Sequence, residues 1–359
     1  MIQLCLQDSP SARILIRAAN WVGDAIMTTP VIRAVRQNYP QAHITVLAKP
    51  WVIPVYETNP HVDEVMVYDN GGRHSKGLGT LRLARDIRNR GFHLSILMQN
   101  AFEAALLAFL AGVPERLGYN TDARSLLLNR CVKMDPALKK GHLIDYYIAI
   151  LTNAGLKPSG RDLELHIPQT DKIWAQDCLA DLNIGPVSPV IGINPGATGG
   201  TAKRWFPERY AELTKKLSED YGTRVIIFGG PADHALGEEI SGMVPGCCVN
   251  MAGKTSLARA FALIGACDLF VTNDSGLMHA AAAQNINQVA VIGSTDVVAT
   301  APANENSIMV REAVDCSPCL KDECPIDHRC MDRISVETVA KACHSLLEGD
   351  LNVKGGTPA

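Results

Sequence analysis

The fold of this chain is judged first from one stretch, Asp268-Leu-Phe-Val-Thr-Asn-Asp-Ser-Gly-Leu-Met-His-Ala-Ala-Ala-Ala283. It begins with the apolar run Leu269–Val271, typical of a buried parallel strand, and ends with Met and four alanines, which favour a helix. Between them, Asp274 and Ser275 are residue types preferred at helix N-caps, and Gly276 allows a ligand or another backbone to come close. The stretch therefore predicts a strand, a tight turn and a helix.

A turn of this kind directs backbone N–H groups and the positive end of the helix dipole at one point, which suits an anion such as a pyrophosphate. The alternative is a capped strand–helix junction that binds nothing, and every α/β protein contains several of these. His279 has the same two interpretations, because a residue in the first helical turn either reaches a ligand or packs against its neighbours.

The length of the chain indicates two domains, since 359 residues exceed the usual size of one. A net charge of −3 argues against a general nucleic-acid binder. The charge is uneven, because residues 1–169 contain 19 Lys and Arg against 14 Asp and Glu, whereas residues 170–359 contain 15 against 23. The basic first half suggests an anionic partner there, and scattered solvated charges are the alternative.

The sequence contains no apolar run near the ~18 residues that a membrane-spanning helix requires. Residues 1–13 lack a basic start followed by an apolar core, so we expect no signal peptide. Most of the 11 cysteines stand alone in apolar surroundings, as reduced core residues do. These features predict a cytoplasmic protein.

Strand-like and helix-like segments alternate, which predicts α/β domains with mostly parallel sheets. The first half predicts strands at 13–18, 44–48, 64–68 and 94–98, and helices at 25–38, 78–90, 102–111 and 142–154, the last a candidate connection. The second half predicts strands at 190–194, 225–228, 269–271 and 289–292, and helices at 207–221, after 233, at 256–266, from 278 and at 336–347. We expect two doubly wound Rossmann-like domains, 1–168 and 169–359, facing across a ligand cleft, with the last helix able to pack back on the first domain.

A carboxylate follows the first predicted strand, in the turn Val22-Gly-Asp24. There Asp24 could serve as a general base facing a ligand. The alternative is an N-cap on the following helix, and from position alone this is the simpler interpretation.

The run Asn194-Pro-Gly-Ala-Thr-Gly-Gly-Thr-Ala-Lys-Arg-Trp-Phe-Pro207 follows another predicted strand. Its small residues, the hydroxyls of Thr198 and Thr201 and the charges of Lys203 and Arg204 make a phosphate-binding loop in chemical terms. The Walker spacing G-x-x-x-x-G-K-[ST] is absent, and a long flexible connection is the alternative.

The strand before Phe228-Gly-Gly-Pro-Ala-Asp233 ends in two glycines and an acid, which suit a ribose diol or an adenine edge. Gly-Gly-Pro also makes an ordinary turn. No G-x-G-x-x-G follows a strand, no Asp-x-Asp pair occurs, and no G-x-S-x-G elbow occurs. These absences argue against a dinucleotide dehydrogenase, a metal-dependent sugar transferase of single-domain type and an α/β-hydrolase.

Four cysteines, Cys316, Cys319, Cys324 and Cys330, lie close together in the sequence, with His328 among them. Their spacing resembles a zinc knuckle, although C-x4-C is an uncommon ligand spacing. Reduced or redox-labile thiols in a loop are the alternative. Because the cluster is far in the sequence from every phosphate-binding motif, we expect it to take no part in catalysis.

Several motifs in order resemble the lipopolysaccharide heptosyltransferases, the glycosyltransferase family 9 enzymes with the GT-B fold. The motifs are Asn20-Trp-Val-Gly-Asp24, Asn194-Pro-Gly-Ala197 with Lys203-Arg-Trp205, Phe228-Gly-Gly230 and Asn273-Asp-Ser-Gly-Leu-Met-His279. The resemblance spans nearly the whole chain.

The resemblance implies an inverting transfer of L-glycero-D-manno-heptose from ADP-heptose to the first inner-core heptose of lipopolysaccharide, without a metal or cofactor. It implies that Asp24 is the general base and that Lys203 contacts the donor phosphates. The further donor-binding residues that it implies are Thr198, Thr201, Asp233, Asp274, Ser275, Gly276, Leu277 and His279.

The implied acceptor is the anionic Kdo–lipid A core, reached at the cytoplasmic face of the inner membrane. The candidate acceptor-binding residues are Trp21, Arg73 and Lys76, although a solvated helix face explains much of the basic run around them. Two other functions stay open. A nucleotide-sugar epimerase of the same fold needs its own acid–base pair, and in a non-catalytic sugar-nucleotide sensor Asp24 need not be acidic.

Overall fold

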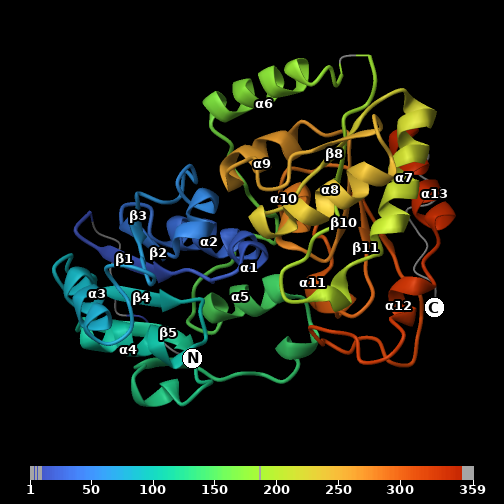
Figure 1. Ribbon diagram of the computed structural model, residues 1–359. Helices are drawn as coiled ribbons and strands as arrows, with labels where there is room; N and C mark the ends of the chain where they lie inside the picture. The colour runs from blue at the N-terminus through green and yellow to red at the C-terminus, as the bar shows by residue number, and fades with distance from the viewer. Residues whose placement is uncertain (1–3, 5, 7–9, 186, 350–359) are drawn as a thin grey trace. The chain divides into compact units, whose positions relative to one another are not determined.

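The computed structural model describes residues 4, 6, 10–185 and 187–349. The chain divides into two compact units, residues 1–166 and 167–359, which are described in turn (Figure 1). Most of the N-terminal segment in which we expect no signal peptide lies outside the described residues. No helix within the described part of the chain is long and apolar enough to cross a membrane.

Unit 1 contains a six-stranded parallel sheet in the order β3-β2-β1-β4-β5-β6. The order reverses between β1 and β4, which makes the sheet doubly wound. Ile14, Leu15 and Ile16 of the central β1 are almost fully buried, as a strand covered on both faces requires. The strands are β1 (Arg13–Arg17), β2 (His43–Ala48), β3 (Glu64–Val67), β4 (Leu94–Leu97), β5 (Glu115–Tyr119) and β6 (Arg130–Val132).

The helices of unit 1 form two groups, since α3 packs on α4, and α5 packs on both α1 and α2. The helix predicted at 25–38, with Pro30 disturbing its first turns, is divided in two: α1 ends before Thr28, and Pro30 stands in the first turn of a new helix, where its missing N–H is not needed. The helices are α1 (Val22–Met27), α2 (Thr29–Asn38), α3 (Leu78–Arg88), α4 (Phe102–Leu110) and α5 (Leu143–Thr152), with short 3₁₀ turns η1 (Pro50–Val55), η2 (Arg124–Leu126) and η3 (Leu138–Lys140).

Unit 2 repeats this topology, with a parallel sheet in the order β12-β11-β10-β7-β8-β9. Val271 of β10 lies opposite Ile193 of β7 and Val289 of β11. The predicted fold class, α/β with two doubly wound sheets, is confirmed. The strands are β7 (Ile191–Asn194), β8 (Val225–Ile227), β9 (Cys248–Asn250), β10 (Leu269–Asn273), β11 (Gln288–Val291) and β12 (Ser307–Val310).

Some elements of unit 2 have weak sequence signals. Helix α6 buries little beyond Ala175 and Leu179, so it lacks a clear apolar stripe, and β9 is too short to show alternation. The helices are α6 (Gln169–Asp181), α7 (Pro207–Tyr221), α8 (His234–Met243), α9 (Leu257–Gly265), α10 (Gly276–Ala283), α11 (Val297–Thr300), α12 (Arg329–Asp332) and α13 (Val336–Leu347), with η4 (Thr201–Lys203) and η5 (Pro231–Asp233).

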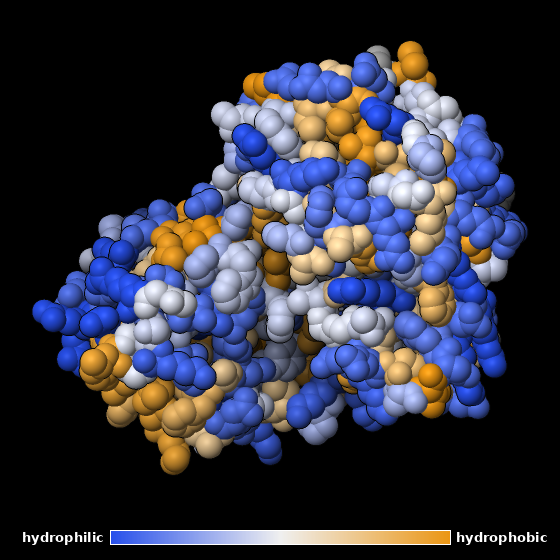
Figure 2. All heavy atoms as spheres, in the orientation of Figure 1, coloured by the Kyte–Doolittle hydropathy of each residue, from blue (hydrophilic) through white to orange (hydrophobic). Residues whose placement is uncertain are grey.

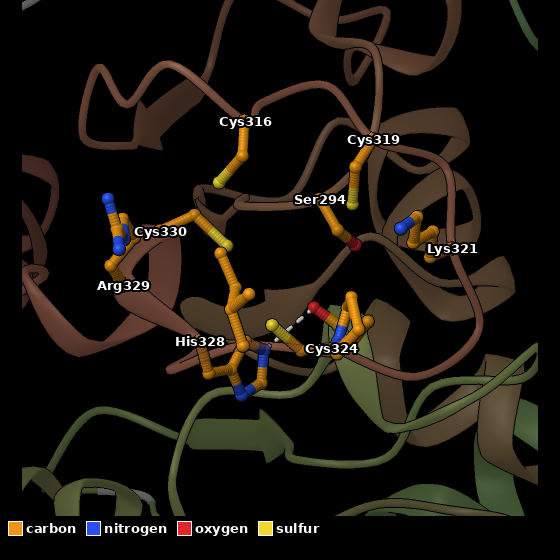
Figure 3. A pocket seen from close by; sticks show the side chains of 11 residues that line it. Ser294, Cys316, Cys319, Lys321, Cys324, His328, Arg329 and Cys330 are labelled. Carbon is orange, nitrogen blue, oxygen red and sulfur yellow. Dashed lines mark hydrogen bonds between the residues drawn. The ribbon is translucent and has the colours of Figure 1, made fainter.

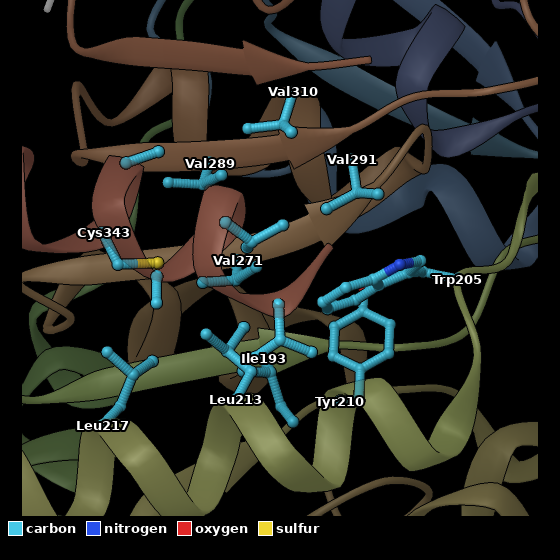
Figure 4. Close-up of a cluster of buried hydrophobic side chains, with 14 of the residues drawn as sticks. Ile193, Trp205, Tyr210, Leu213, Leu217, Val271, Val289, Val291, Val310 and Cys343 are labelled. Atoms are coloured by element: carbon cyan, nitrogen blue, oxygen red, sulfur yellow. The ribbon is translucent and has the colours of Figure 1, made fainter. Parts of the chain in front are cut away.

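Buried side chains fill the space between the sheet of unit 2 and helices α7 and α13 (Figure 4). Trp205 is 1% exposed and stands edge-on to Tyr210, with ring centroids 5.2 Å apart. The Trp205 indole N–H donates to the Ile334 carbonyl at 3.1 Å. Because Trp205 lies near the end of the glycine-rich run, the core anchors that run at its C-terminal side.

Candidate functional site

The best location for a ligand in a doubly wound sheet is the point where the strand order reverses, outside the carboxyl ends of the strands. In unit 2 this point lies between β7 and β10. The segments that follow these two strands are the glycine-rich run after Asn194 and the turn Asn273–Gly276. The two motifs singled out in the sequence therefore meet at one place, through residues that are 81 positions apart in the chain.

The turn after β10 is built as the sequence predicts. Ser275 is the N-cap of α10, and its hydroxyl accepts from the Met278 N–H at 3.4 Å. The Asn194 side-chain amide donates to Ser275 Oγ at 2.8 Å, which joins the end of β7 to this cap. The positive end of the α10 dipole thus lies beside the glycine-rich run.

Asn273 holds the two loops together, a role that the sequence did not indicate. This fully buried side chain donates from Nδ2 to the Pro195 carbonyl at 2.8 Å. Its Oδ1 accepts from the Trp205 N–H and from the Tyr210 hydroxyl, each at 3.1 Å. A buried amide satisfied on both sides fixes the position of each neighbour.

Lys203 and Asp274, both predicted donor-binding residues, form an ion pair with Nζ and Oδ2 3.7 Å apart. Asp274 is buried, whereas Lys203 is 28% exposed. Asp274 also accepts from the Thr300 hydroxyl at 3.2 Å, a contact that the sequence did not predict. A half-buried ammonium held at a helix N-terminus is suited to bind a phosphate oxygen.

The glycines of the loop have conformations that other residues disfavour. Gly199 and Gly200 have φ values of +94° and +112°. A Cβ on Gly200 would lie 1.9 Å from the Asp322 carbonyl oxygen, whereas a Cβ on Gly199 would meet nothing within 4 Å. Thr198 and Thr201 on either side are exposed, so their hydroxyls are accessible to a ligand.

The cysteine-rich segment, which is remote in the sequence, packs directly on this loop. The Ala202 N–H donates to the Asp322 carbonyl at 3.0 Å. His328 Nε2 lies 2.9 Å from the Ala202 carbonyl, and its ring stands edge-on to Phe206. The cysteine-rich segment and the phosphate-binding motif are far apart in the sequence, but this distance did not indicate that they are apart in the fold.

Asp233, the predicted ribose acid, is partly used by the protein itself. Its Oδ2 accepts from the Gly230 N–H at 3.0 Å, which closes the η5 turn, and its Oδ1 lies 3.6 Å from the Arg204 guanidinium. A Cβ on Gly196 would lie 2.5 Å from the Asp233 carboxyl carbon, so glycine is needed for this close approach. The ribose assignment stays a prediction.

The two remaining predicted residues of α10 differ in accessibility. Leu277 is half-buried at the start of the helix, whereas His279 is only 3% exposed. Such burial favours the packing interpretation of His279 over direct contact with a ligand.

In unit 1 the strand order reverses between β1 and β4, and Asp24 lies in the first turn of α1 just after β1. The Tyr147 hydroxyl from α5 donates to Asp24 Oδ1 at 2.8 Å. Burial, and then the charge of Asp24, raise the pKa of Tyr147 well above its ordinary value. Tyr147 therefore keeps its proton and remains a hydrogen-bond donor to the carboxylate.

Cationic and aromatic side chains surround the same end of the sheet, and the sequence did not predict most of them. Trp21 is 61% exposed. Trp51 donates from its indole N–H to the Asn20 carbonyl at 2.7 Å, and the Lys49 ammonium lies 5.0 Å from the Trp51 ring centroid. Burial lowers the pKa of Arg17 to about 10, and burial followed by the charge of Arg17 lowers the pKa of Lys49. The position of Lys49 directly after a predicted strand was the signal that could have found it.

The predicted acceptor residues after β3 are partly neutralised. Arg73 donates to both carboxylate oxygens of Asp86, at 3.0 and 2.8 Å. His74 contacts the same carboxylate, and these residues with Arg90 line an open groove of about 480 Å³. Lys76 is exposed.

Comparisons with known proteins give the family and the fold of the chain. The family model described as glycosyltransferase family 9 (heptosyltransferase) matches residues 80–329. Lipopolysaccharide heptosyltransferase 2 of Salmonella typhimurium is 32% identical over 93% of this chain and 98% of its own, and that of Escherichia coli K12 is 33% identical over 83% and 88%. The solved structure of E. coli ADP-heptose LPS heptosyltransferase II, 30% identical, superposes with a TM-score of 0.80 over 94% of this chain and 99% of its own.

Proposed function

The chain belongs to glycosyltransferase family 9, and from this premise we propose that it is an ADP-heptose:lipopolysaccharide heptosyltransferase II. It transfers L-glycero-D-manno-heptose from ADP-heptose to the first inner-core heptose of the Kdo–lipid A acceptor. Unit 1 binds the acceptor and unit 2 binds the donor. The observation that carries this assignment is the Lys203–Asp274 pair at the N-terminus of α10, beside a glycine-rich loop.

Departure of ADP develops negative charge on the β-phosphate. Lys203 and the backbone N–H groups at the start of α10 supply positive charge at that position, and this arrangement favours the transition state over the ground state. Lys203 leaves its contact with Asp274 as the phosphate binds. Because these groups neutralise the leaving phosphate, the step uses no metal ion.

Asp24 accepts the proton of the attacking acceptor hydroxyl. The hydroxyl oxygen forms a bond to the anomeric carbon, the bond from that carbon to the β-phosphate oxygen breaks on the opposite face, and ADP leaves with inverted configuration at the sugar. The Tyr147 hydroxyl holds Oδ1 of Asp24 and leaves the carboxylate charged. This contact supports the general-base role.

The acceptor carries phosphate and Kdo carboxylate groups, and the cations of unit 1 fit these anions. Lys49 lies at the carboxyl end of the sheet beside the exposed ring of Trp51, on which a sugar face can stack, whereas Arg17 and the neighbouring Tyr68 ring are buried. Trp21 and Lys76 are further exposed side chains of unit 1 that can contact the acceptor. Arg73 contributes less charge than expected, because Asp86 binds it.

We also propose that unit 1 contacts the cytoplasmic face of the inner membrane, where the lipid acceptor lies. Helices α3 and α4 expose apolar side chains, and Figure 2 shows apolar residues gathered over these helices. Arg82 and Arg85 on α3 are exposed and attract anionic lipid headgroups. The exposed apolar residues are Leu78, Leu81, Phe102 and Phe109.

The test incubates purified protein with ADP-heptose and an acceptor bearing one core heptose, followed by mass spectrometry of both substrates. We expect one heptose to be added and ADP to be released, and UDP-sugars to give no product. Epimerised donor without transfer would identify an epimerase. Donor binding without any product would identify a sensor. Sedimentation with anionic and with neutral vesicles tests the membrane contact separately.

A further inference from the structure

Four thiols of unit 2 face one small cavity that the proposed transfer does not use (Figure 3). The cavity has a volume of about 140 Å³, and Cys316, Cys319, Cys324 and Cys330 all line it. Figure 3 shows the four sulfurs directed toward the space between them. The segment with the spacing C-x2-C-x4-C-x5-C thus brings four soft ligands to one place. This arrangement is stronger evidence for a metal site than the uncommon spacing is against it.

Thiolate sulfur is a preferred ligand of structural zinc, and four such ligands complete its tetrahedral shell. Lys321 and Arg329 line the same cavity, where they offset the negative charge of a metal–tetrathiolate group.

The segment around the cavity has little secondary structure or apolar packing to stabilise it. Residues 311–328 contain no helix or strand, and Leu320 and Ile326 are exposed rather than packed in a core. Leu320 and His328 have left-handed backbone conformations, with φ of +55° at each. Segments with so little apolar burial are commonly held by disulfides or by a structural metal.

We propose that Cys316, Cys319, Cys324 and Cys330 bind one structural Zn²⁺ ion. The four thiols release four protons on binding, four sulfur–zinc bonds form, and no oxidation or reduction occurs. Among the described residues no three His, Cys, Asp or Glu side chains already stand at metal-binding geometry. Binding therefore draws the four sulfurs, which already face the cavity, closer together until the Zn–S distances are about 2.3 Å.

Zinc in this position supports the donor loop without touching the substrate. Asp322 and His328 belong to the zinc-bearing segment, and both contact the backbone of Ala202. Ala202 is the neighbour of Lys203, so the ion stiffens the turn from which that lysine projects. The serine variants should accordingly lose donor affinity as well as metal.

The test measures metal on the full-length protein in the absence of donor and acceptor, so failure of zinc binding and failure of heptose transfer are separate results. Elemental analysis should find about one zinc per chain. Cobalt added to the metal-stripped protein should produce the charge-transfer absorption of a tetrahedral cobalt thiolate. The Cys319→Ser/Cys324→Ser variant should lose both signals, whereas Cys178→Ser, which changes a thiol on α6, should keep them.

Three results would overturn the site. These are a wild-type protein that holds no zinc after purification with zinc present, a serine variant that keeps a full equivalent, and peptide mapping that finds the four cysteines in disulfides. If the serine variant fails to fold, the cobalt spectrum of the wild-type protein decides by itself.

Discussion

The two units share one strand order, but the segments that follow their central strands differ in how they are built. In unit 1, β1 is followed by side chains with chemistry of their own, among them Trp21 and Asp24. In unit 2, β7 is followed by glycines with positive φ, and β10 by a capped helix start. The candidate site of unit 1 therefore consists mainly of side chains, whereas that of unit 2 consists largely of backbone groups.

The difference matches the groups that each end is proposed to handle. A pyrophosphate presents many similar oxygens, so backbone N–H groups, a helix N-terminus and one lysine are enough to bind it. A proton transfer needs one carboxylate at a defined position, and Tyr147 fixes the position of Asp24 with a hydrogen bond of 2.8 Å. The same topology thus accommodates two kinds of chemistry.

Asp24→Asn gives the largest expected effect, because it removes the base and keeps the shape. We expect turnover to fall by ~10²–10⁴, with donor affinity unchanged. Asparagine is nearly isosteric with aspartate, and Asp24 is not the N-cap of α1, so the melting temperature should hold. Single-turnover transfer, calorimetric ADP-heptose binding and a melting curve measure the three quantities. Transfer within a few-fold of wild type would mean that Asp24 is not the general base.

Lys203→Ala tests the other unit. Loss of one charge-assisted contact to the leaving phosphate is worth ~2–4 kcal/mol, or roughly 30- to 1,000-fold in kcat/KM. Steady-state kinetics should show both a weaker KM for the donor and a lower kcat. Lys215→Ala is the matched control, since Lys215 is an exposed lysine of α7 paired with Glu219. Equal kinetics in the two variants would remove Lys203 from the site.

Gly200→Ala and Gly199→Ala form a pair that tests the support of the donor loop. Both positions have positive φ, so alanine at either costs about 1–2 kcal/mol in backbone strain. At Gly200 the new methyl group also overlaps the Asp322 carbonyl oxygen. We expect Gly200→Ala to weaken ADP binding roughly 10-fold more than Gly199→Ala. Calorimetry measures both affinities, and equal losses would mean that the contact with residue 322 does not shape the loop.

Tyr147→Phe gives the smallest effect, because it removes only the hydrogen bond to the base. We expect kcat to fall roughly 10-fold, because the carboxylate loses the hydrogen bond that holds it in place. The raised pKa of Tyr147 keeps its proton in place as pH increases, so the bond is lost only above the ordinary phenol value of ~10. Tyr221→Phe, which removes a hydroxyl bound to His344, is the control. An unchanged kcat would leave Tyr147 with a packing role.

The sequence was sufficient to predict features that depend only on residues close together in the chain. The β10–α10 turn was predicted because an apolar run, N-cap residues and alanines stand next to one another in the chain. The alternation of strands and helices was visible for the same reason. Short strands such as β6 and β9 were not, because three residues cannot show a period.

The contacts within the candidate site were beyond prediction, because their partners are distant in the chain. Tyr147 and Asp24 are 123 residues apart, and His328 and Ala202 are 126 apart. Asn273 was part of a motif, but its role depends on Trp205 and Pro195, which only the folded sheet brings close. Motif types locate a site, whereas tertiary packing decides which side chains complete it.

The bond from Trp205 to Ile334 has a consequence for synthesis of the chain. The two residues are 129 positions apart, so the donor loop reaches its anchor only after the ribosome has released residue 334. Unit 1 emerges first and can fold while unit 2 is still being made. A nascent chain or a truncated product that ends before Ile334 should therefore carry a formed first unit and an unanchored donor loop, which makes the C-terminal segment the last requirement for nucleotide binding.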